Sequence, residues 1–242
     1  MSPQTSSFFC PSTLFCLLHL RPHPRCVYWF LRSATIQTSA SGKVLGFACF
    51  DVETTRLDPA SGHVIEIAVV RVAANGRPEG EWSTLLNPGT QDLGRVDIHG
   101  IQLSWLADAP TFGEIAGDFA TFMSGCVPVA HNASFDRGFL RAEWDRAGLG
   151  QIDIDALDTL PLAKNLGLPG RLADLTTALD IPLNGAHMAL ADSRALAGVL
   201  IALLDRADNP VHTPLFEPPL LTPAASGRFA HRPNICDLTT PS

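Results

Sequence analysis

The sequence predicts an α/β domain with a central five-stranded mixed sheet flanked by helices. Two observations lead to this prediction. Three strand-like segments come first, joined in the manner of hairpins, and short apolar strands then alternate with helical segments. Hairpins give antiparallel pairs and strand–helix alternation gives parallel pairs, so a chain with both patterns forms a mixed sheet. A chain of 242 residues is also long enough to bury a core of its own.

Each expected strand has its own signal. Residues 44–53 are almost wholly apolar, which is typical of a strand buried on both faces. Residues 64–72 are rich in β-branched side chains, and the pair Asn75-Gly76 then favours a hairpin into a strand at residues 81–86. The two remaining strands are expected at residues 127–130 and 152–157.

Apolar spacing and end signals mark the helices. The clearest covers residues 189–206, where apolar residues recur every three or four positions and form one stripe. Gly148 ends a second helix, which is expected over residues 134–147. The other expected helices cover residues 112–124, 160–166 and 172–179.

The two ends of the chain differ in composition from the middle. Residues 1–43 contain no acidic residue, and we expect a disordered extension or sequence translated upstream of the true start, with an organelle-targeting segment as the alternative. Residues 207–242 are rich in proline, which removes backbone donors and breaks helices, so we expect an extended, mostly disordered tail. The folded domain is expected to run from residue 44 to residue 206.

The composition excludes several classes of protein. With 24 acidic and 17 basic residues the net charge is −7, which argues against a protein that binds nucleic acid only by neutralising phosphates. No apolar run reaches the length of a membrane span, so no membrane partner is expected. The six cysteines form no C-x-x-C pair, and we interpret Cys49 and Cys126 as reduced core residues of a cytoplasmic protein.

Four acidic residues stand where the pattern predicts a core. Asp51 and Glu53 end the first strand two positions apart, so their side chains point to the same face. Asp192 lies on the apolar stripe of the last helix, and Asp136 lies in the first turn of its helix. Buried carboxylates repel one another unless they share a cation. The alternatives are a solvated strand end for the first pair and helix N-terminal acids for the other two.

A histidine accompanies the acidic residues. His187 lies five positions before Asp192, in a loop expected after Asn184-Gly185. On a helix the two side chains would diverge by about 140°, whereas from a loop His187 can face the same site. A lone loop histidine is usually a surface residue, but beside a metal site it is a candidate general base.

Three ordered motifs resemble those of a known family. FDVETT (residues 50–55), HNASFDRGFL (131–140) and HMALADSRA (187–195) are similar to the exonuclease motifs of DEDDh 3′–5′ exonucleases. The likeness is to the DnaQ-like group, which includes the proofreading epsilon subunit of bacterial DNA polymerase III and ribonuclease T. It covers residues 44–206 and extends to the pieces HGI, DAPTF and LDTL. One departure is Arg56, where the family often has glycine.

The resemblance implies a ribonuclease H-like fold and a metal-dependent 3′–5′ exonuclease. It implies two divalent cations, Mg²⁺ or Mn²⁺, held by Asp51, Glu53, Asp136 and Asp192, with His187 as the catalytic base. The implied substrate is a single-stranded DNA 3′ end, cut in proofreading or repair with release of nucleoside 5′-monophosphates. The alternatives are an exoribonuclease that trims RNA 3′ ends by the same chemistry and a non-catalytic nucleic-acid-binding module.

The candidates for substrate binding lie in or beside these motifs. They are Thr54, Leu57, His99, Asn132 and Phe135. For His99 a purely structural role is an equal alternative. Asp158 is expected to be a helix cap, and Glu66 a structural residue outside the site. The proline-rich tail suggests a further partner, a DNA polymerase subunit.

Overall fold

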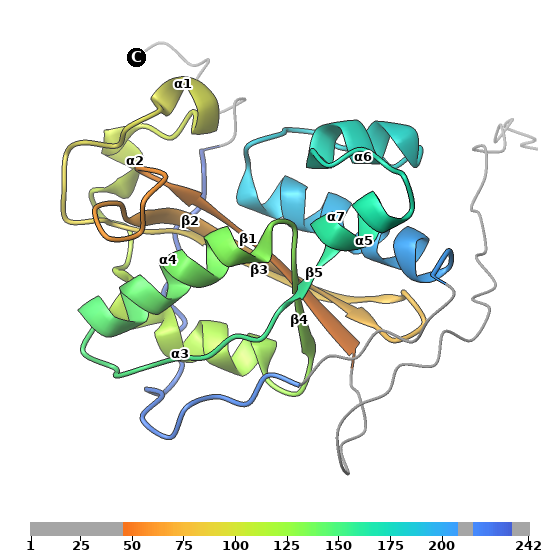
Figure 1. Ribbon diagram of the computed structural model, residues 1–242. Coiled ribbons are helices and arrows are strands. Elements are labelled where there is room, and N and C mark those ends of the chain that lie inside the picture. The colour runs from red at the N-terminus through yellow and green to blue at the C-terminus, as the bar shows by residue number, and fades with distance from the viewer. Residues whose placement is uncertain (1–45, 208–214, 234–242) are drawn as a thin grey trace, which may run out of the picture. The chain divides into compact units, whose positions relative to one another are not determined.

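The computed structural model describes residues 46–207 and 215–233 (Figure 1). They form a five-stranded sheet in the order β3-β2-β1-β4-β5. The pairs β1–β2 and β2–β3 are antiparallel, and the pairs β1–β4 and β4–β5 are parallel. The predicted α/β architecture with a mixed sheet of five strands is therefore confirmed.

The elements follow the sequence patterns closely, and the three largely buried strands β2, β1 and β4 lie at the centre of the sheet. The strands are β1 Gly46–Thr54, β2 Val64–Ala73, β3 Pro78–Leu85, β4 Val127–Ala130 and β5 Leu157–Asp158. The helices are α1 Val96–His99, α2 Leu103–Leu106, α3 Phe112–Met123, α4 Ala133–Arg146, α5 Thr159–Asn165, α6 Leu172–Ala178 and α7 Ala189–Leu204.

The fifth strand is shorter than predicted. A strand was expected over residues 152–157, but β5 is limited to Leu157 and Asp158 because only these residues lie opposite the end of β4. Ile152 and Ile154 are buried in the core all the same. Their alternating burial resembles that of a strand, so the pattern alone could not reveal that no neighbouring strand pairs with them.

Two helices were not predicted. α1 and α2 each contain four residues. Periodicity needs more than one turn to become visible, so helices of this length leave no signal in the sequence. β3 also begins three residues earlier than expected, at Pro78.

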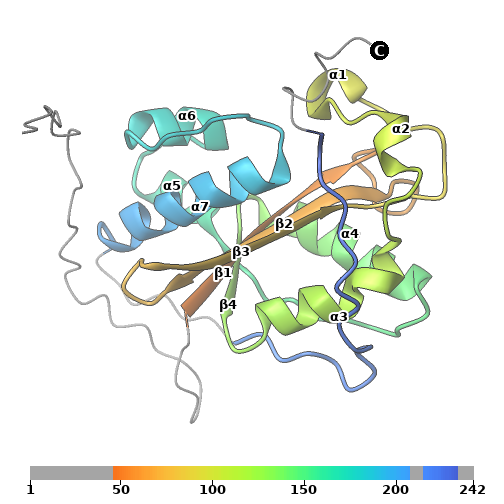
Figure 2. The ribbon, with the colours of Figure 1, turned by 180° about the vertical axis from the view of Figure 1, so that it is seen from behind.

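Helices cover both faces of the sheet (Figures 1 and 2). Side chains of β1 alternate between these faces. Phe50 and Val52 pack towards α3 and α4, whereas Phe47 and Cys49 pack towards α7. Asp51 and Glu53 follow Phe47 and Cys49 at every second position, so β1 directs both carboxylates to the face of the sheet that α7 covers.

The C-terminal segment, residues 215–233, is extended and packs against α3. Phe216 is only 3% exposed, and its ring lies 6.5 Å from that of Phe119. The carboxylate of Asp118 accepts hydrogen bonds from the backbone N–H groups of Ser226 and Gly227, at 2.7 and 3.0 Å. The extended conformation agrees with the proline content, but the expected disorder is not found in residues 215–233, because apolar and polar anchors bind them to the domain.

The segment then continues from α3 towards the sheet, as Figure 2 shows. It passes so close to α3 that a Cβ on Gly117 would lie 2.3 Å from the carbonyl oxygen of Pro223. Beyond this point the carbonyl of Ala230 accepts a hydrogen bond from the N–H of Leu85, at the end of β3. Arg232 follows and reaches Glu66 on β2.

The remaining sequence predictions concern the cysteines, the N-terminal extension and a membrane span. Cys49 and Cys126 are buried and unpaired, as predicted, while the cytoplasmic location inferred with them stays a prediction. The predicted N-terminal extension, residues 1–43, lies outside the described residues. Within the described part of the chain, every helix is too short or too polar to cross a membrane.

Candidate active site

The end of β1 and the start of α7 bring three of the predicted residues together. Glu53, His187 and Asp192 each offer one possible ligand atom, and these atoms lie within 4.8 Å of one another. Glu53 reaches this position because side chains alternate between the two faces of β1. Asp192 reaches it because it lies on the same helix stripe as Leu196, which packs on the sheet. His187 precedes α7, as predicted.

Asp51 and Asp136 add two carboxylates from β1 and α4. Asp136 lies in the first turn of α4 and is 3% exposed. α4 begins directly after β4, which runs parallel to β1, so the carboxyl ends of both strands lie at the same edge of the sheet. The charges of Asp136, Glu53 and Asp192 all act on Asp51. The structure therefore places all four predicted acids in one electrostatic cluster.

Burial makes the ionised form of these acids unfavourable. Burial raises the pKa of Asp51 well above its usual range, and the charge of Asp136 raises it further. Burial raises the pKa of Glu53 to about 8 and that of Asp136 to about 8. The pKa of Asp192 is also raised by burial. These carboxylates can be ionised together at neutral pH only if a positive charge joins them.

The donor set fits a hard divalent cation. Carboxylate oxygens are the ligands that Mg²⁺ and Mn²⁺ prefer in proteins. The charge of Arg232 lowers the pKa of Glu53, but the hydrogen bonds of this arginine go to Glu66 and to backbone carbonyls. A divalent cation between Asp51 and its neighbours would offset the remaining repulsion, so these residues fit the metal that the resemblance implies.

The backbone of His187 is held in the left-handed region, with φ at 64°. This conformation is uncommon for a residue with a side chain. The N–H of His187 donates to Oδ2 of Asp192 at 3.0 Å, and its carbonyl accepts from Arg232 at 3.1 Å. The side chain is exposed, so it can meet a substrate that arrives from solvent.

The loop after β1 presents an apolar side chain to solvent. Leu57 is 84% exposed, and Thr54 fixes the turn before it by donating its hydroxyl hydrogen to the carbonyl of Arg56 at 2.7 Å. Arg56, which replaces the usual glycine, pairs with Asp92 on the surface at 2.5 Å. Leu57 follows Glu53 by four residues, and its side chain is accessible to a ligand from solvent.

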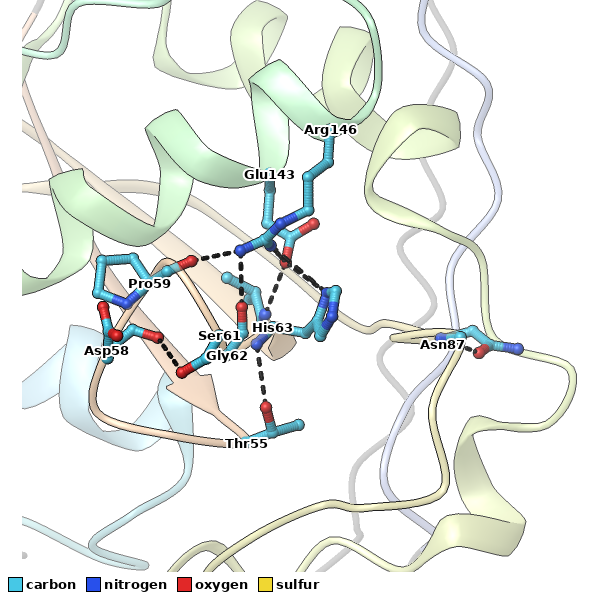
Figure 3. A network of polar contacts seen from close by, with 11 residues as sticks. Thr55, Asp58, Pro59, Ser61, Gly62, His63, Asn87, Glu143 and Arg146 are labelled. Carbon is cyan, nitrogen blue, oxygen red and sulfur yellow. Dashed lines mark hydrogen bonds and ion pairs between the residues drawn. The ribbon is translucent and has the colours of Figure 1, made fainter.

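A polar network fastens this loop to α4 (Figure 3). The guanidinium of Arg146 donates to the carbonyls of Pro59 and Gly62 and to the carboxylate of Glu143, the last at 2.6 Å. Glu143 also accepts a hydrogen bond from the N–H of Val64, where β2 begins. The network thus holds the middle of the loop and the end that leads into β2.

Asn132 and Phe135 flank Asp136, as the sequence indicated. Asn132 is exposed in a left-handed conformation, and its N–H donates to Asp158 at 2.9 Å. Phe135 is half-buried, with its ring 4.9 Å from that of Phe139. Asp158 also accepts from the N–H of Leu160 and caps α5, which confirms the cap predicted for it.

His99 is placed in the interior. Its Nδ1 accepts a hydrogen bond from the N–H of Ile101 at 3.1 Å, and its Nε2 lies 3.0 Å from the carbonyl oxygen of Leu93. Both ring nitrogens are therefore engaged by the backbone. The geometry favours the structural alternative for His99, and we do not retain it as a candidate substrate contact.

Two residues at the edge of the site were not predicted as part of it. Glu66 faces Glu53 across the β1–β2 pair, accepts a hydrogen bond from the N–H of Ala189 at 2.9 Å, and binds Arg232. A buried acid within an apolar strand was the available signal for Glu66. No local pattern could reveal Arg232, because its partner lies 166 positions away.

Residues 48–200 match a family model described as "Exonuclease", RNase_T. The chain belongs to this exonuclease family. The resemblance of the three motifs to DnaQ-like DEDDh exonucleases is thereby confirmed. The match begins within β1 and ends within α7, so this exonuclease domain contains all five residues of the predicted catalytic set.

Two curated relatives carry the same domain within much longer chains. The DNA polymerase III PolC-type protein of Oceanobacillus iheyensis is 36% identical over 165 residues, which cover 66% of this chain and 11% of that protein. The DNA polymerase III subunit epsilon-like protein of Rhodobacter capsulatus is 37% identical over 168 residues, which cover 66% of this chain and 24% of the relative. The chain thus spans a minor part of these proteins.

Solved structures show the same fold. The nuclease domain of 3′hExo, a DEDDh family member bound to rAMP, superimposes with a TM-score of 0.61 at 16% identity, covering 71% of this chain and 98% of that one. Exonuclease I of E. coli in complex with a dT13 oligonucleotide gives a TM-score of 0.56 at 20% identity, covering 65% and 40%. The expected ribonuclease H-like exonuclease fold is confirmed.

Proposed function

We propose that this exonuclease-family protein is a metal-dependent 3′–5′ exonuclease that acts on single-stranded DNA ends. The observation that carries the proposal is the convergence of Glu53, His187 and Asp192 within 4.8 Å. Asp51 and Asp136 extend this group to the full set of four acids and one histidine. The two relatives named for DNA polymerase III support DNA as the substrate.

The acidic residues would hold two divalent cations, Mg²⁺ or Mn²⁺. The metal ligands proposed are Asp51, Glu53, Asp136 and Asp192. When bound, such ions make water a stronger nucleophile and stabilise the charge that develops on the leaving oxygen. Ligation requires the ionised carboxylates. The raised pKa values of Glu53 and Asp136, about 8 each, therefore make metal binding and activity increase with pH.

His187 would act as the general base. Its exposed imidazole accepts a proton from the attacking water while that water forms a bond to the terminal phosphorus. The bond from phosphorus to the 3′ oxygen of the preceding nucleotide breaks, which frees a nucleoside 5′-monophosphate and a strand one residue shorter. General-base assistance of this kind contributes about 10²–10⁴-fold to the rate.

Four of the candidate residues would position the strand end. Leu57 would pack against the terminal base, since its side chain is exposed at the loop that follows the catalytic strand. Thr54 fixes that loop through its bond to the carbonyl of Arg56. Asn132 and Phe135 flank Asp136 at the start of α4 and would line the sugar and base pocket.

The second candidate function is RNA 3′-end trimming by the same chemistry. The structural likeness to a nuclease domain with bound rAMP motivates it. We favour DNA because the two curated relatives described above, at 36% and 37% identity, are named for DNA polymerase III. The same names motivate a polymerase subunit as a partner through the C-terminal segment. Co-purification of a replicative DNA polymerase with the full chain tests that partner, and its absence would contradict it.

The deciding experiment uses the full chain with 5′-labelled single-stranded DNA and matched RNA, in Mg²⁺, Mn²⁺ or EDTA. We expect a metal-dependent ladder that shortens from the 3′ end, faster on DNA, and absent in Asp51→Ala. Faster cleavage of RNA would favour the second candidate. A folded protein that binds either strand without cutting it would support a binding module and contradict the proposal.

A further inference from the structure

The C-terminal segment reaches the candidate active site at Arg232, which makes four hydrogen bonds there. Its Nε and Nη2 donate to the two carboxylate oxygens of Glu66, both at 2.8 Å. Its Nη1 donates to the carbonyl of His99 at 2.7 Å, and its Nη2 also donates to the carbonyl of His187 at 3.1 Å. One side chain thus joins β2, α1 and the loop that carries the candidate base.

Glu66 extends this connection to α7. The carboxylate oxygen that binds Nη2 of Arg232 also accepts the N–H of Ala189, the first residue of α7, at 2.9 Å. The pair therefore holds the backbone on both sides of Met188: the carbonyl of His187 before it and the N–H of Ala189 after it.

This arrangement holds the backbone from which the imidazole of His187 projects. The left-handed backbone of His187 has its N–H bound by Asp192 and its carbonyl bound by Arg232. A residue keeps such a conformation only where its surroundings impose it. Without the bond from Arg232, one of the two constraints on this backbone is lost and the side chain can turn away from the cluster.

We propose that Arg232 is a positioning residue of the exonuclease reaction, supplied by the C-terminal segment to hold His187 over the carboxylate cluster. This inference rests on the proposed function, in which His187 is the base. The segment has anchors of its own at Phe216 and at the bonds from Ser226 to Asp118. It can therefore stay bound when Arg232 is replaced, which makes the role of this side chain separable from that of the segment.

The chain offers a matched control for the test. Arg228 lies on the same segment, and within the described part of the chain its side chain forms an ion pair with Glu114 on α3 rather than with a residue of the site. We would compare Arg232→Met, Arg232→Lys and Arg228→Met in the full chain, on 5′-labelled single-stranded DNA with Mn²⁺. Misplacement of a catalytic group can cost about 10²-fold, so we expect kcat to fall by that order in Arg232→Met with KM little changed. Arg232→Lys keeps the charge and should recover part of the loss, and Arg228→Met should match the wild type.

A second set of variants asks whether Arg232 acts through His187. If it does, Arg232→Met lowers kcat in the native background but has no further effect once His187→Ala has removed the base. Equal losses in both backgrounds would overturn the proposal, as would an unchanged kcat in Arg232→Met.

A measurement without turnover separates this inference from the proposed function. Hydrogen exchange at the N–H groups of His187 and Ala189 should be faster in Arg232→Met than in the wild type or in Arg228→Met. Unchanged exchange would overturn the inference. A wild-type protein that cuts no nucleic acid would instead overturn the proposed function, and the exchange measurement would still decide whether Arg232 holds this loop.

Discussion

Glu66 and Arg232 are joined by two hydrogen bonds of 2.8 Å, although 166 positions of the chain separate them. Their side chains are 8% and 14% exposed. Two parallel bonds between a guanidinium and a carboxylate are among the stronger polar contacts in proteins. Glu66 lies opposite Glu53 in the register of β1 and β2, and the positive charge of Arg232 lowers the pKa of Glu53. One contact thus links the C-terminal segment to both the geometry and the charge of the site.

Asp51→Asn should make the metal-free protein more stable while abolishing exonuclease activity. Asn has nearly the same shape as Asp but carries no charge that must be buried among Asp136, Glu53 and Asp192. Thermal unfolding in EDTA tests this, and each kcal/mol of stability gained should raise Tm by about 2–4 °C. The exposed Asp97→Asn serves as a control. A lower Tm for Asp51→Asn in EDTA would contradict the picture of repelling carboxylates.

The stability of the metal-free protein should fall as pH rises. Glu53 and Asp136 have pKa values of about 8 in the folded state, against ordinary values of 4.5 and 3.8. Between these limits the folded state binds more protons than the unfolded state, so the free energy of unfolding decreases with pH and levels off above about 8. Because a metal binds the ionised acids, the rise in Tm on adding Mn²⁺ should be larger at about pH 8.5 than at about pH 5.5. A Tm in EDTA that increases over this interval would contradict the prediction.

Arg146→Met should weaken DNA binding by loosening the loop that carries Leu57. The substitution removes the donors to the carbonyls of Pro59 and Gly62. It also removes the arginine partner of the buried Glu143 and leaves that carboxylate with His63 at 3.3 Å, so the double variant with Glu143→Gln separates loop order from stability. We expect the double variant to regain Tm while KM for DNA stays raised by about fivefold, equivalent to roughly 1 kcal/mol. Recovery of KM together with Tm would show that the network serves stability alone.

Phe216→Ala should destabilise the whole domain. Its side chain is buried in the core cluster with Phe119, and removing a buried phenylalanine costs about 3–5 kcal/mol. Phe229→Ala, on the same segment, removes a half-exposed ring that packs edge-on against Trp82 and should cost much less. Chemical denaturation of the two variants provides the comparison. A midpoint for Phe216→Ala equal to that of the wild type would indicate that residues 215–233 contribute little to the fold.

Most of the fold could be predicted from the sequence because periodicity and turn signals are local. The apolar run of β1, the spacing of α7 and the hairpin at Asn75-Gly76 each depend on a few neighbouring residues. The packing of residues 215–233 against α3 could not be predicted in this way. Their composition favours an extended chain, and only tertiary contacts such as those of Asp118 decide whether that chain packs on the domain.

In the candidate site, too, residues with a local sequence signal could be predicted, whereas roles that depend on tertiary contacts could not. Asp51, Glu53 and Asp192 could be singled out because each is an acid within an apolar pattern, and a motif supported His187. His99 looked similar to a site residue in sequence, yet its ring nitrogens are engaged by Leu93 and Ile101. Hydrogen bonds to the backbone leave no mark on composition, so a structural histidine and a ligand-binding one cannot be told apart at this level.

The position of Arg232 in the chain has a consequence for biosynthesis. Proteins are made from the N-terminus, and domains fold as they emerge from the ribosome. The four acids and His187 are therefore translated before the arginine that fixes the histidine loop is added. A nascent domain would carry its acidic cluster while its base was still unrestrained. Full hydrolytic capacity would then arise only when translation has passed Arg232.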